Sequence, residues 1–292
     1  MAQFLISAFA DEAAEDLAGQ IAALTRNGLF CIEPRNVNGN LIKKTDEELF
    51  EIARQLKEAG ISVSSLGSPI GKFDIHGAFD EHLADFERAL RACEILGAKN
   101  MRVFSFFLED GEKQEYRDEV LRRMRILVER AARAGVTLCH ENEADIYGQN
   151  PSEVKDLLEN VEGLRGIFDG ANYVAKEQDP LEGLAATLPH LEYLHVKDQV
   201  RETGEMVPCG MGDGCYEEVL RQVDLATDGV VYLTLEPHLH TFEAFSRIDK
   251  RTLKTALTFE TADDAFDCAV TYLKNTLTKL GFHEGENNLW KK

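Results

Sequence analysis

The chain has 292 residues, of which 44% are hydrophobic and 29% charged, a composition typical of a folded protein with a large core. Its 32 Lys and Arg residues against 52 Asp and Glu residues give a formal net charge of −20. A surface of this sign repels phosphodiester backbones and anionic membranes, so we expect neither a nucleic acid nor a membrane as a partner.

Short apolar runs rich in β-branched and aromatic residues recur along the chain, and each gap between them holds an amphipathic segment. We expect the runs to be strands and the gaps to be helices. The runs are 4–9, 30–35, 62–67, 101–107, 137–142, 165–169, 193–198 and 231–237. The gap before the fourth run shows the helical pattern most clearly, with apolar residues at three- and four-residue steps: Leu83, Phe86, Leu90, Cys93 and Leu96.

Several helix boundaries are marked by capping residues. Thr45 and Glu48 have the spacing of a capping box at a helix start. Three helices end in a glycine, at Gly28, Gly60 and Gly135, and a new strand follows within two residues. Such short connections are typical of the helix-to-strand turns of a parallel sheet.

Eight strand–helix units predict an α/β fold, a closed (β/α)8 TIM barrel, rather than a doubly wound open sheet, which needs no eighth repeat. We expect a single domain over residues 1–292, with a C-terminal helix at about 262–281 and a short tail after it. Most of the runs end in polar residues. Because all strand carboxyl ends of a barrel meet on one face, these polar residues should line a shared mouth.

Side chains that bind metals stand at four consecutive strand ends, namely Glu141, Asp169, His195 and Glu236. Three carboxylates placed together would repel one another unless a cation or a proton joined them. The alternative is that each carboxylate pairs separately with a Lys or Arg. The repetition on four strands favours one shared divalent metal. This donor set suits Mn²⁺ best, with Mg²⁺, Co²⁺ or Zn²⁺ as alternatives.

The motifs at these strand ends, "GVTLCHENEADIYG", "FDGANYV", "YLHVKDQ", "VPCGMGDG" and "LTLEPHL", resemble the sugar phosphate isomerase/epimerase family of xylose isomerase-like TIM barrels. The resemblance extends from "ISAFADE" through the last strand. It implies that the four side chains bind one divalent metal and that the substrate is a small carbohydrate. It also implies that Glu141 and Glu236 act as an acid/base pair on opposite faces of the sugar.

Further residues are candidates for binding the substrate. Asn172 stands where characterised ketose 3-epimerases of the family carry a histidine, so a substrate contact differs. Lys197 could bind a substrate oxygen or phosphate, or pair with a barrel carboxylate. Lys72, in the loop "GSPIGK", could reach the mouth, which His238 should also face. Arg35 is either a substrate clamp or, as we favour, an ion pair at the rim.

Two polar neighbours of the fifth strand end have simpler interpretations. Strand alternation turns His140 away from the mouth, so we expect a buried histidine that contacts the helices or supports the site. Glu143 lies beyond the strand, where a solvated loop residue is expected.

These residue types permit removal of a proton next to a carbonyl, through an enediolate, as in a sugar isomerase or epimerase. A lyase or hydrolase of keto-sugar glycosides could use the same metal and base. A non-catalytic sugar-binding protein would not need three carboxylates. An enzyme like the apurinic endonucleases is disfavoured by the net charge and by the single histidine among the predicted ligands.

The six cysteines form no CxxC pair, which favours free thiols in a reducing compartment. The opening "MAQFLISAFADEAAED" lacks the basic start of a signal peptide, and no apolar run approaches the roughly 18 residues of a membrane span. We therefore expect a cytoplasmic protein. Its oligomeric state is open, and a homo-oligomer is one of the options.

Overall fold

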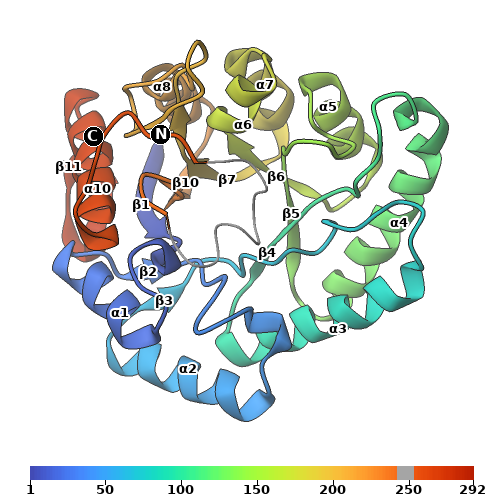
Figure 1. The fold of residues 1–292 in the computed structure, drawn as a ribbon, viewed down its shortest axis with the longest axis horizontal. Coiled ribbons are helices and arrows are strands. Elements are labelled where there is room, and N and C mark those ends of the chain that lie inside the picture. Colours follow the sequence, from blue (N-terminus) through green and yellow to red (C-terminus); the bar gives the residue numbers. More distant parts are fainter. Residues whose placement is uncertain (242–252) are drawn as a thin grey trace.

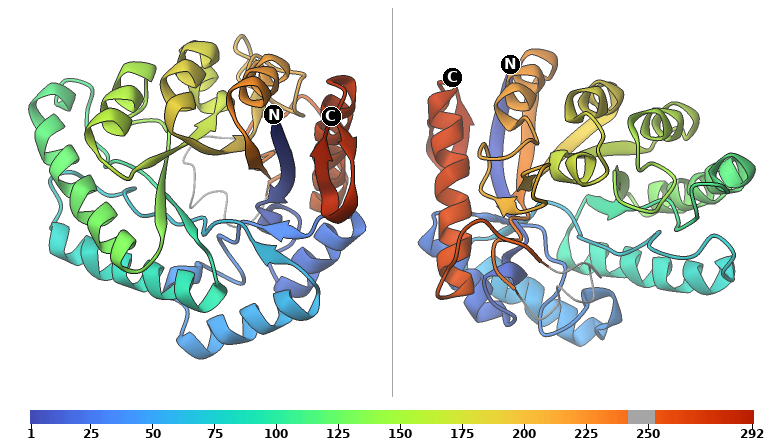
Figure 2. Two further views of the ribbon diagram at one scale, coloured as in Figure 1. Left: turned by 180° about the vertical axis from the view of Figure 1, so that it is seen from behind. Right: turned by 45° about the horizontal axis from the view of Figure 1, so that its top comes forward.

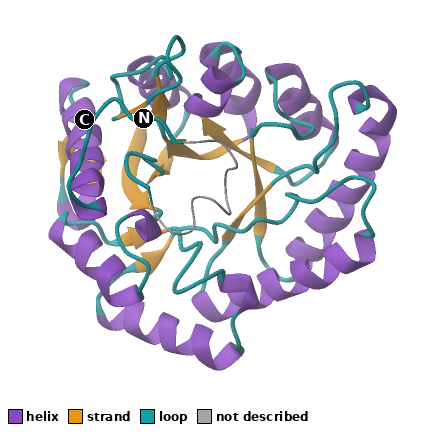
Figure 3. Cartoon of the chain, viewed as in Figure 1, coloured by secondary structure: helices purple, strands orange, loops and turns teal. Residues whose placement is uncertain are grey.

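A computed structural model describes residues 1–241 and 253–292, which form a barrel of parallel strands inside a ring of helices (Figures 1 and 3). The predicted α/β barrel is confirmed. Within the described residues, each predicted run overlaps a strand: β1 (Ala2–Ala8), β2 (Cys31–Ile32), β3 (Ser62–Val63), β4 (Asn100–Val103), β5 (Thr137–Glu141), β6 (Arg165–Asp169), β7 (Leu191–Val196) and β10 (Gly229–Leu235). The labels β8 (Asp198–Gln199) and β9 (Met206–Val207) belong to a small hairpin after β7.

The helices follow one another around the ring in chain order, as the colours of Figure 1 show. They are α1 (Leu17–Arg26), α2 (Asp46–Glu58), α3 (Phe79–Leu96), α4 (Lys113–Arg133), α5 (Pro151–Asn160), α6 (Gly170–Ala175), α7 (Pro180–Thr187), α8 (Tyr216–Ala226) and α10 (Ala262–Lys279). The capping box of Thr45 and Glu48 is present at the start of α2. Gly28, Gly60 and Gly135 all have φ between 65° and 72°, so they end their helices in the left-handed conformation.

Six of the barrel strands pair in parallel in the order β1-β10-β7-β6-β5-β4, whereas β2 and β3 pair with each other. A few further backbone hydrogen bonds complete the ring. The Glu33 amide donates to the Ala8 carbonyl (3.0 Å). The Leu66 amide donates to the Asn100 carbonyl (2.9 Å), and the Leu66 carbonyl accepts from the Arg102 amide (3.0 Å). The runs at 30–35 and 62–67 were thus placed correctly but predicted too long. Pro34 contributes to this difference because it has no amide proton for a ladder.

The C-terminal segment lies beside the first strand (Figure 2). After α10, the strands β11 (His283–Glu284) and β12 (Leu289–Lys291) form a hairpin. Strand β12 pairs antiparallel with β1, where Phe4 lies opposite Trp290. The tail therefore covers the part of the β1 edge that the short β2 leaves unpaired.

One hydrophobic cluster joins the barrel to its helices and includes strand residues such as Phe4 and helix residues such as Phe86 and Phe266. Among the described residues, no helix is both long and apolar enough to span a bilayer.

Candidate metal centre

The four predicted metal ligands meet at the carboxyl ends of the last barrel strands. Glu141 and Asp169 end β5 and β6, His195 is the penultimate residue of β7, and Glu236 directly follows β10. All four are buried, and one ligand atom from each lies within 4.8 Å of the others. His195 Nδ1 lies 2.8 Å from Glu141 Oε1 and 3.7 Å from Glu236 Oε2. We call these four residues the strand-end cluster.

The strand-end cluster fits a divalent cation. Burial, together with the charges of Glu141 and Glu236, raises the pKa of Asp169 to about 7, although the Lys197 ammonium opposes the shift. Lys197 Nζ lies 3.1 Å from Asp169 Oδ2. Within residues 1–241 and 253–292, however, no group donates a hydrogen bond to that buried oxygen. Three carboxylates, an imidazole and an oxygen that lacks a donor are a suitable set of hard and borderline ligands.

Buried cations from other strands surround the strand-end cluster. Arg102, in β4, places Nη1 3.2 Å from Glu141 Oε2 and 3.9 Å from Glu236 Oε1. Arg35 Nη1 lies 2.6 Å from Glu236 Oε1, and Lys197 Nζ lies 3.4 Å from Glu236 Oε2. The carboxylates thus share a site and also have cationic partners, which the sequence had offered as alternatives. Arg102 was not predicted, although a charged residue within an apolar strand is a signal that could have found it.

These cations keep two of the carboxylates ionised. Burial alone would raise the pKa of Glu141, but the charges of His195 and Arg102 outweigh it and lower the pKa. Glu236 is likewise buried, yet Lys197 and other cationic groups hold its pKa well below the ordinary value. Both side chains therefore carry the negative charge that metal binding or proton abstraction requires.

Arg35 forms an ion pair, as favoured from the sequence, but it lies in the interior and not at the rim. Its guanidinium makes two 3.0 Å hydrogen bonds to the Asp11 carboxylate and lies 4.2 Å above the Phe9 ring. Asp11 and Glu12 lie in the short 3-10 helix Ala10–Glu12 that comes after β1, and both are buried. Neither was predicted as a site residue, although they occupy a strand end like those of the cluster.

The prediction that Glu143 is solvated was wrong. Its carboxylate lies 2.9 Å from Lys72 Nζ, and its side chain is only 16% exposed. Burial raises the pKa of Glu143, but the charges of Lys72 and Lys197 outweigh this effect and lower it to about 2. Lys72 therefore reaches the mouth as an ion pair. His140 is buried as predicted, and its Nε2 lies 2.8 Å from Ser105 Oγ.

Two polar side chains fix the strand ends that carry the ligands. The Asn142 amide accepts a hydrogen bond from the Asp169 amide (3.0 Å) and donates to the Asp169 carbonyl (2.9 Å). The Tyr216 hydroxyl accepts from the Gly170 and Lys197 amides and donates to the His195 carbonyl (2.7 Å). These bonds hold β5 to β6 and β6 to β7 at the level of the ligands.

A cavity of about 460 Å³ adjoins the strand-end cluster. Three predicted substrate-binding residues, Asn172, Lys197 and His238, contribute to its wall. The Asn172 side chain donates to the Asn142 carbonyl (2.8 Å), so the protein holds it in a fixed orientation. The cavity is large enough for a small carbohydrate and brings three of the predicted residues beside the candidate metal ligands.

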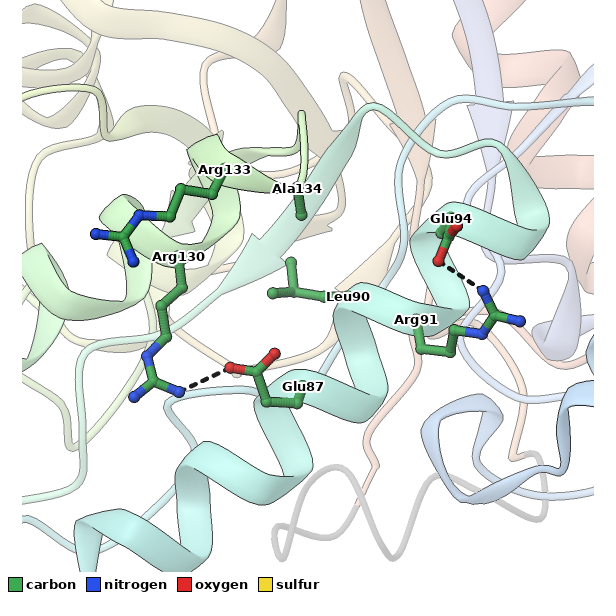
Figure 4. A pocket seen from close by; sticks show the side chains of 7 residues that line it. All are labelled: Glu87, Leu90, Arg91, Glu94, Arg130, Arg133 and Ala134. Carbon is green, nitrogen blue, oxygen red and sulfur yellow. Dashed lines mark hydrogen bonds and ion pairs between the residues drawn. The ribbon is translucent and has the colours of Figure 1, made fainter.

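A larger hollow, of about 740 Å³, lies between α3 and α4. Figure 4 shows that charged side chains line it and that two ion pairs, Arg130–Glu87 and Arg91–Glu94, stand in its walls. It lies near the helix ends that lead into β4 and β5, on the opposite side from the strand carboxyl ends. It has no connection with the strand-end cluster.

A family model described as xylose isomerase-like TIM barrel matches residues 21–257. No curated protein sequence is similar enough to match the chain. Among solved structures, the probable 3-DHS dehydratase AsbF from Bacillus anthracis has a TM-score of 0.69 at 16% identity, over 94% of this chain and 99% of that one. The IOLI protein with a zinc atom has a TM-score of 0.71 at 14% identity, over 94% and 99%.

D-allulose 3-epimerase from Methylomonas sp. has a TM-score of 0.71 at 17% identity, over 94% of this chain and 100% of that one. At such identities these structures show the shared fold alone. The family model covers most of the chain, and the chain belongs to the xylose isomerase-like TIM barrel family.

Proposed function

We propose that the protein is a divalent-metal-dependent isomerase or epimerase of a small carbohydrate, which removes a proton from a carbon next to a carbonyl. One observation carries this proposal. Two ionised glutamates, Glu141 and Glu236, lie in one buried cluster with Asp169 and His195, beside a cavity of about 460 Å³. A cation bound there, with Mn²⁺ as the first choice, would polarise the carbonyl and stabilise the negative charge that follows proton loss.

The protein's own residues supply the proton transfer. Glu141 and Glu236 stand on different strands and approach the His195 ring from 2.8 Å and 3.7 Å. An isomerase would use one of them to move a proton between neighbouring carbons. An epimerase would use the second to return the proton on the other face. This assignment agrees with the acid/base pair that the family resemblance implies.

Lys197 is the residue best placed to hold the substrate. Its ammonium lies between Asp169 and Glu236, and the residue also lines the cavity. Lys197 can therefore donate to a substrate oxygen while it keeps its contacts with these two carboxylates. Asn172 and His238 line the same cavity and would orient the hydroxyl groups. The identity of the sugar depends on these contacts.

Elimination is the second candidate, because it begins with the same proton abstraction. His238 Nε2 lies 3.5 Å from Glu236 Oε1 and the residue lines the cavity. Burial lowers the pKa of His238 and favours the neutral ring, whose N–H could still donate to a departing oxygen. The position of this histidine is the observation that favours a lyase acting on keto-sugar derivatives.

The experiment is a screen of keto- and aldo-sugars, with and without a phosphate group, in D₂O with Mn²⁺. Mass spectrometry would follow deuterium uptake in the presence of Mn²⁺ and, as the control, after the metal has been chelated. We expect a substrate to gain deuterium at a carbon next to its carbonyl, and the product to identify an epimer, an isomer or an eliminated compound. A substrate that turns over with all carbon-bound hydrogens retained, and without need of metal, would overturn the proposal.

A further inference from the structure

Glu33, which follows β2, is a buried carboxylate on the far side of the His195 ring. Its side chain is fully buried, and its Oε2 lies 3.3 Å from His195 Nε2. His195 Nδ1, on the other side of the ring, faces Glu141 and Glu236. The imidazole is therefore held between Glu33 and the strand-end cluster.

The surroundings of Glu33 leave it little else to bind. Its Oε1 accepts a hydrogen bond from the Tyr193 hydroxyl at 2.9 Å, and that hydroxyl also lies 2.9 Å from Ser65 Oγ. Within the described ranges, no Lys or Arg nitrogen comes within 4.0 Å of the Glu33 carboxylate. Burying a carboxylate costs free energy unless a cation or a hydrogen-bond donor faces it. For Glu33 Oε2, that partner is the His195 ring.

The position of Glu33 is fixed by the backbone as well. Its amide donates to the Ala8 carbonyl, which is the bond that joins β2 to β1 in the barrel. His195 is constrained from the side by Phe9, whose ring lies edge-on at 5.1 Å. Neither partner of the Glu33–His195 contact can move away without disturbing the barrel wall.

A neutral imidazole carries one proton, and the hydrogen bond of one ring nitrogen decides which nitrogen keeps a free lone pair. A carboxylate can only accept, so Glu33 requires a proton at His195 Nε2, and Glu141, 2.8 Å from Nδ1, requires one at Nδ1 as long as no cation occupies the cluster. A cation held by the cluster would replace the Nδ1 proton, because Glu33 keeps the proton at Nε2, and the lone pair would then lie on Nδ1, the nitrogen that faces the cluster. We propose that Glu33 is the positioning residue that selects this tautomer, so that His195 binds the divalent cation through Nδ1.

This inference rests on the proposed function only in that a divalent metal occupies the strand-end cluster. Carboxylates behind metal-binding histidines orient the ring and raise its basicity, and their loss typically weakens metal affinity about 10- to 100-fold. Metal affinity and ring protonation can both be measured without a substrate. Failure of the exchange experiment would therefore leave the present inference open to its own test.

The first test uses the unaltered protein, labelled with ¹⁵N-histidine and loaded with ¹¹³Cd²⁺. We expect the His195 resonances to show a proton on Nε2 and coupling of ¹¹³Cd to Nδ1. Assignment follows from the loss of these signals in His195→Gln. Coupling of ¹¹³Cd to Nε2, a proton on Nδ1, or no coupling to His195 at all would overturn the proposal.

The second test compares Glu33→Leu, which removes the acceptor, with Glu33→Gln, which keeps an acceptor oxygen without the charge. We expect Mn²⁺ affinity, measured by competition with a chelating dye, to fall about 10- to 100-fold in Glu33→Leu and less in Glu33→Gln. In a His195→Gln background, Glu33→Leu should cause no further loss. Equal losses with and without His195 would show that Glu33 only packs. Should Glu33→Leu not fold, Glu33→Gln and the ¹¹³Cd spectrum still decide.

Discussion

Asp169 has two functions at the end of β6, and a single substitution can separate them. Its Oδ1 accepts a hydrogen bond from the Asn172 amide and so caps α6, whereas the buried Oδ2 accepts none from the described residues and is left for a cation. Asn caps a helix about as well as Asp but carries no charge. We expect Asp169→Asn to reduce bound metal from about one ion per chain to almost none, measured by elemental analysis after dialysis. The metal-free variant should unfold in urea at nearly the same concentration as the metal-free parent. Full metal content in the variant would refute the ligand assignment.

Glu141 and Glu236 can be tested by replacement with glutamine, which has nearly the same shape and cannot accept a proton. At saturating Mn²⁺, we expect either substitution to slow deuterium exchange into the sugar by at least about 100-fold, the usual scale for loss of a general base. The KM should change much less, because the cavity wall is retained. Glu143→Gln is the matched control at the mouth and should keep most of the exchange rate. If both cluster variants exchanged at the parent rate, the base would lie elsewhere.

His82 provides a prediction about pH. Its Nε2 accepts a hydrogen bond from the Gly71 amide (3.0 Å), and its ring stacks on Phe73. Burial lowers the pKa of His82 from 6.5 to about 4; the Asp85 charge opposes this shift and the Arg123 charge adds to it. Because the unfolded chain takes up the proton first, this histidine makes the folded state less stable as the pH falls from 6.5 towards 4. The free energy of unfolding should lose about 1.4 kcal/mol per pH unit from this one proton.

Replacing His82 by Gln keeps an acceptor for the Gly71 amide and removes the titrating group. The free energy of unfolding, measured with urea at a series of pH values, should fall less steeply in the variant between pH 6.5 and 4. The difference in slope should correspond to about one proton. An unchanged slope would mean that His82 binds its proton equally in both states.

The sequence could identify the ligands of the candidate centre but not their partners. Glu141 and Asp169 follow apolar runs directly, so their position at a strand end can be read from the chain. The contacts of Glu33 and Arg102 with the cluster depend on the barrel's curvature and on side-chain direction, which a strand pattern does not contain. The same applies to Glu143, where a position beyond the strand indicated solvent but the fold provided Lys72 as a partner.

At the scale of elements, the carboxyl ends of β6 and β7 pair in parallel and are also bridged by one hydroxyl, that of Tyr216 at the start of α8. Tyr216→Phe would leave the amides of Gly170 and Lys197 and the carbonyl of His195 without this partner. We expect the free energy of unfolding to fall by about 1–3 kcal/mol, the usual cost of buried polar groups left unsatisfied. Metal affinity should fall as well, because Asp169 and His195 lie on these strand ends.

Tyr147→Phe is the matched control for this prediction. Its hydroxyl donates to Asp156 on α5, away from the ligands, so stability can fall while metal affinity stays unchanged. Urea unfolding and dye competition measure the two quantities separately. A Tyr216→Phe protein with the parent's metal affinity would show that α8 does not position the ligands.

Periodicity and capping residues were sufficient to place the eight described barrel strands and the helical segments between them, since these signals are local. They could not give the lengths of β2 and β3, which depend on the neighbouring strand in the barrel. They also did not indicate β12, because its pairing with β1 joins residues from opposite ends of the chain. The fourth run was also predicted too long, since β4 ends at Val103. Beyond it, Phe106 has a φ of 71°, and its amide donates to the Gly71 carbonyl.

For the whole molecule, the net charge of −20 makes the stability sensitive to any cation. Stabilisation by a metal bound at the cluster must therefore be separated from stabilisation by screening of the surface charge. A metal that binds the strand-end cluster of the folded protein stabilises it by about 2.7 kcal/mol when its concentration is 100 times its dissociation constant. For a chain of this size, we expect the Tm to rise by roughly 5 °C. Mn²⁺ and Mg²⁺ should be compared with NaCl at equal ionic strength, which screens the surface charge but does not bind the cluster.

The control variant is Asp169→Asn, which changes the net charge of the chain by one unit and disrupts the cluster. Its Tm should rise with divalent salt only as far as it does with NaCl, whereas the parent protein should gain the additional increase and lose it again on chelation. Calorimetry of both proteins measures this difference directly. If the two proteins gained equally from Mn²⁺, the ions would be acting on the acidic surface, and the buried carboxylates would be held by Arg35, Arg102 and Lys197 alone.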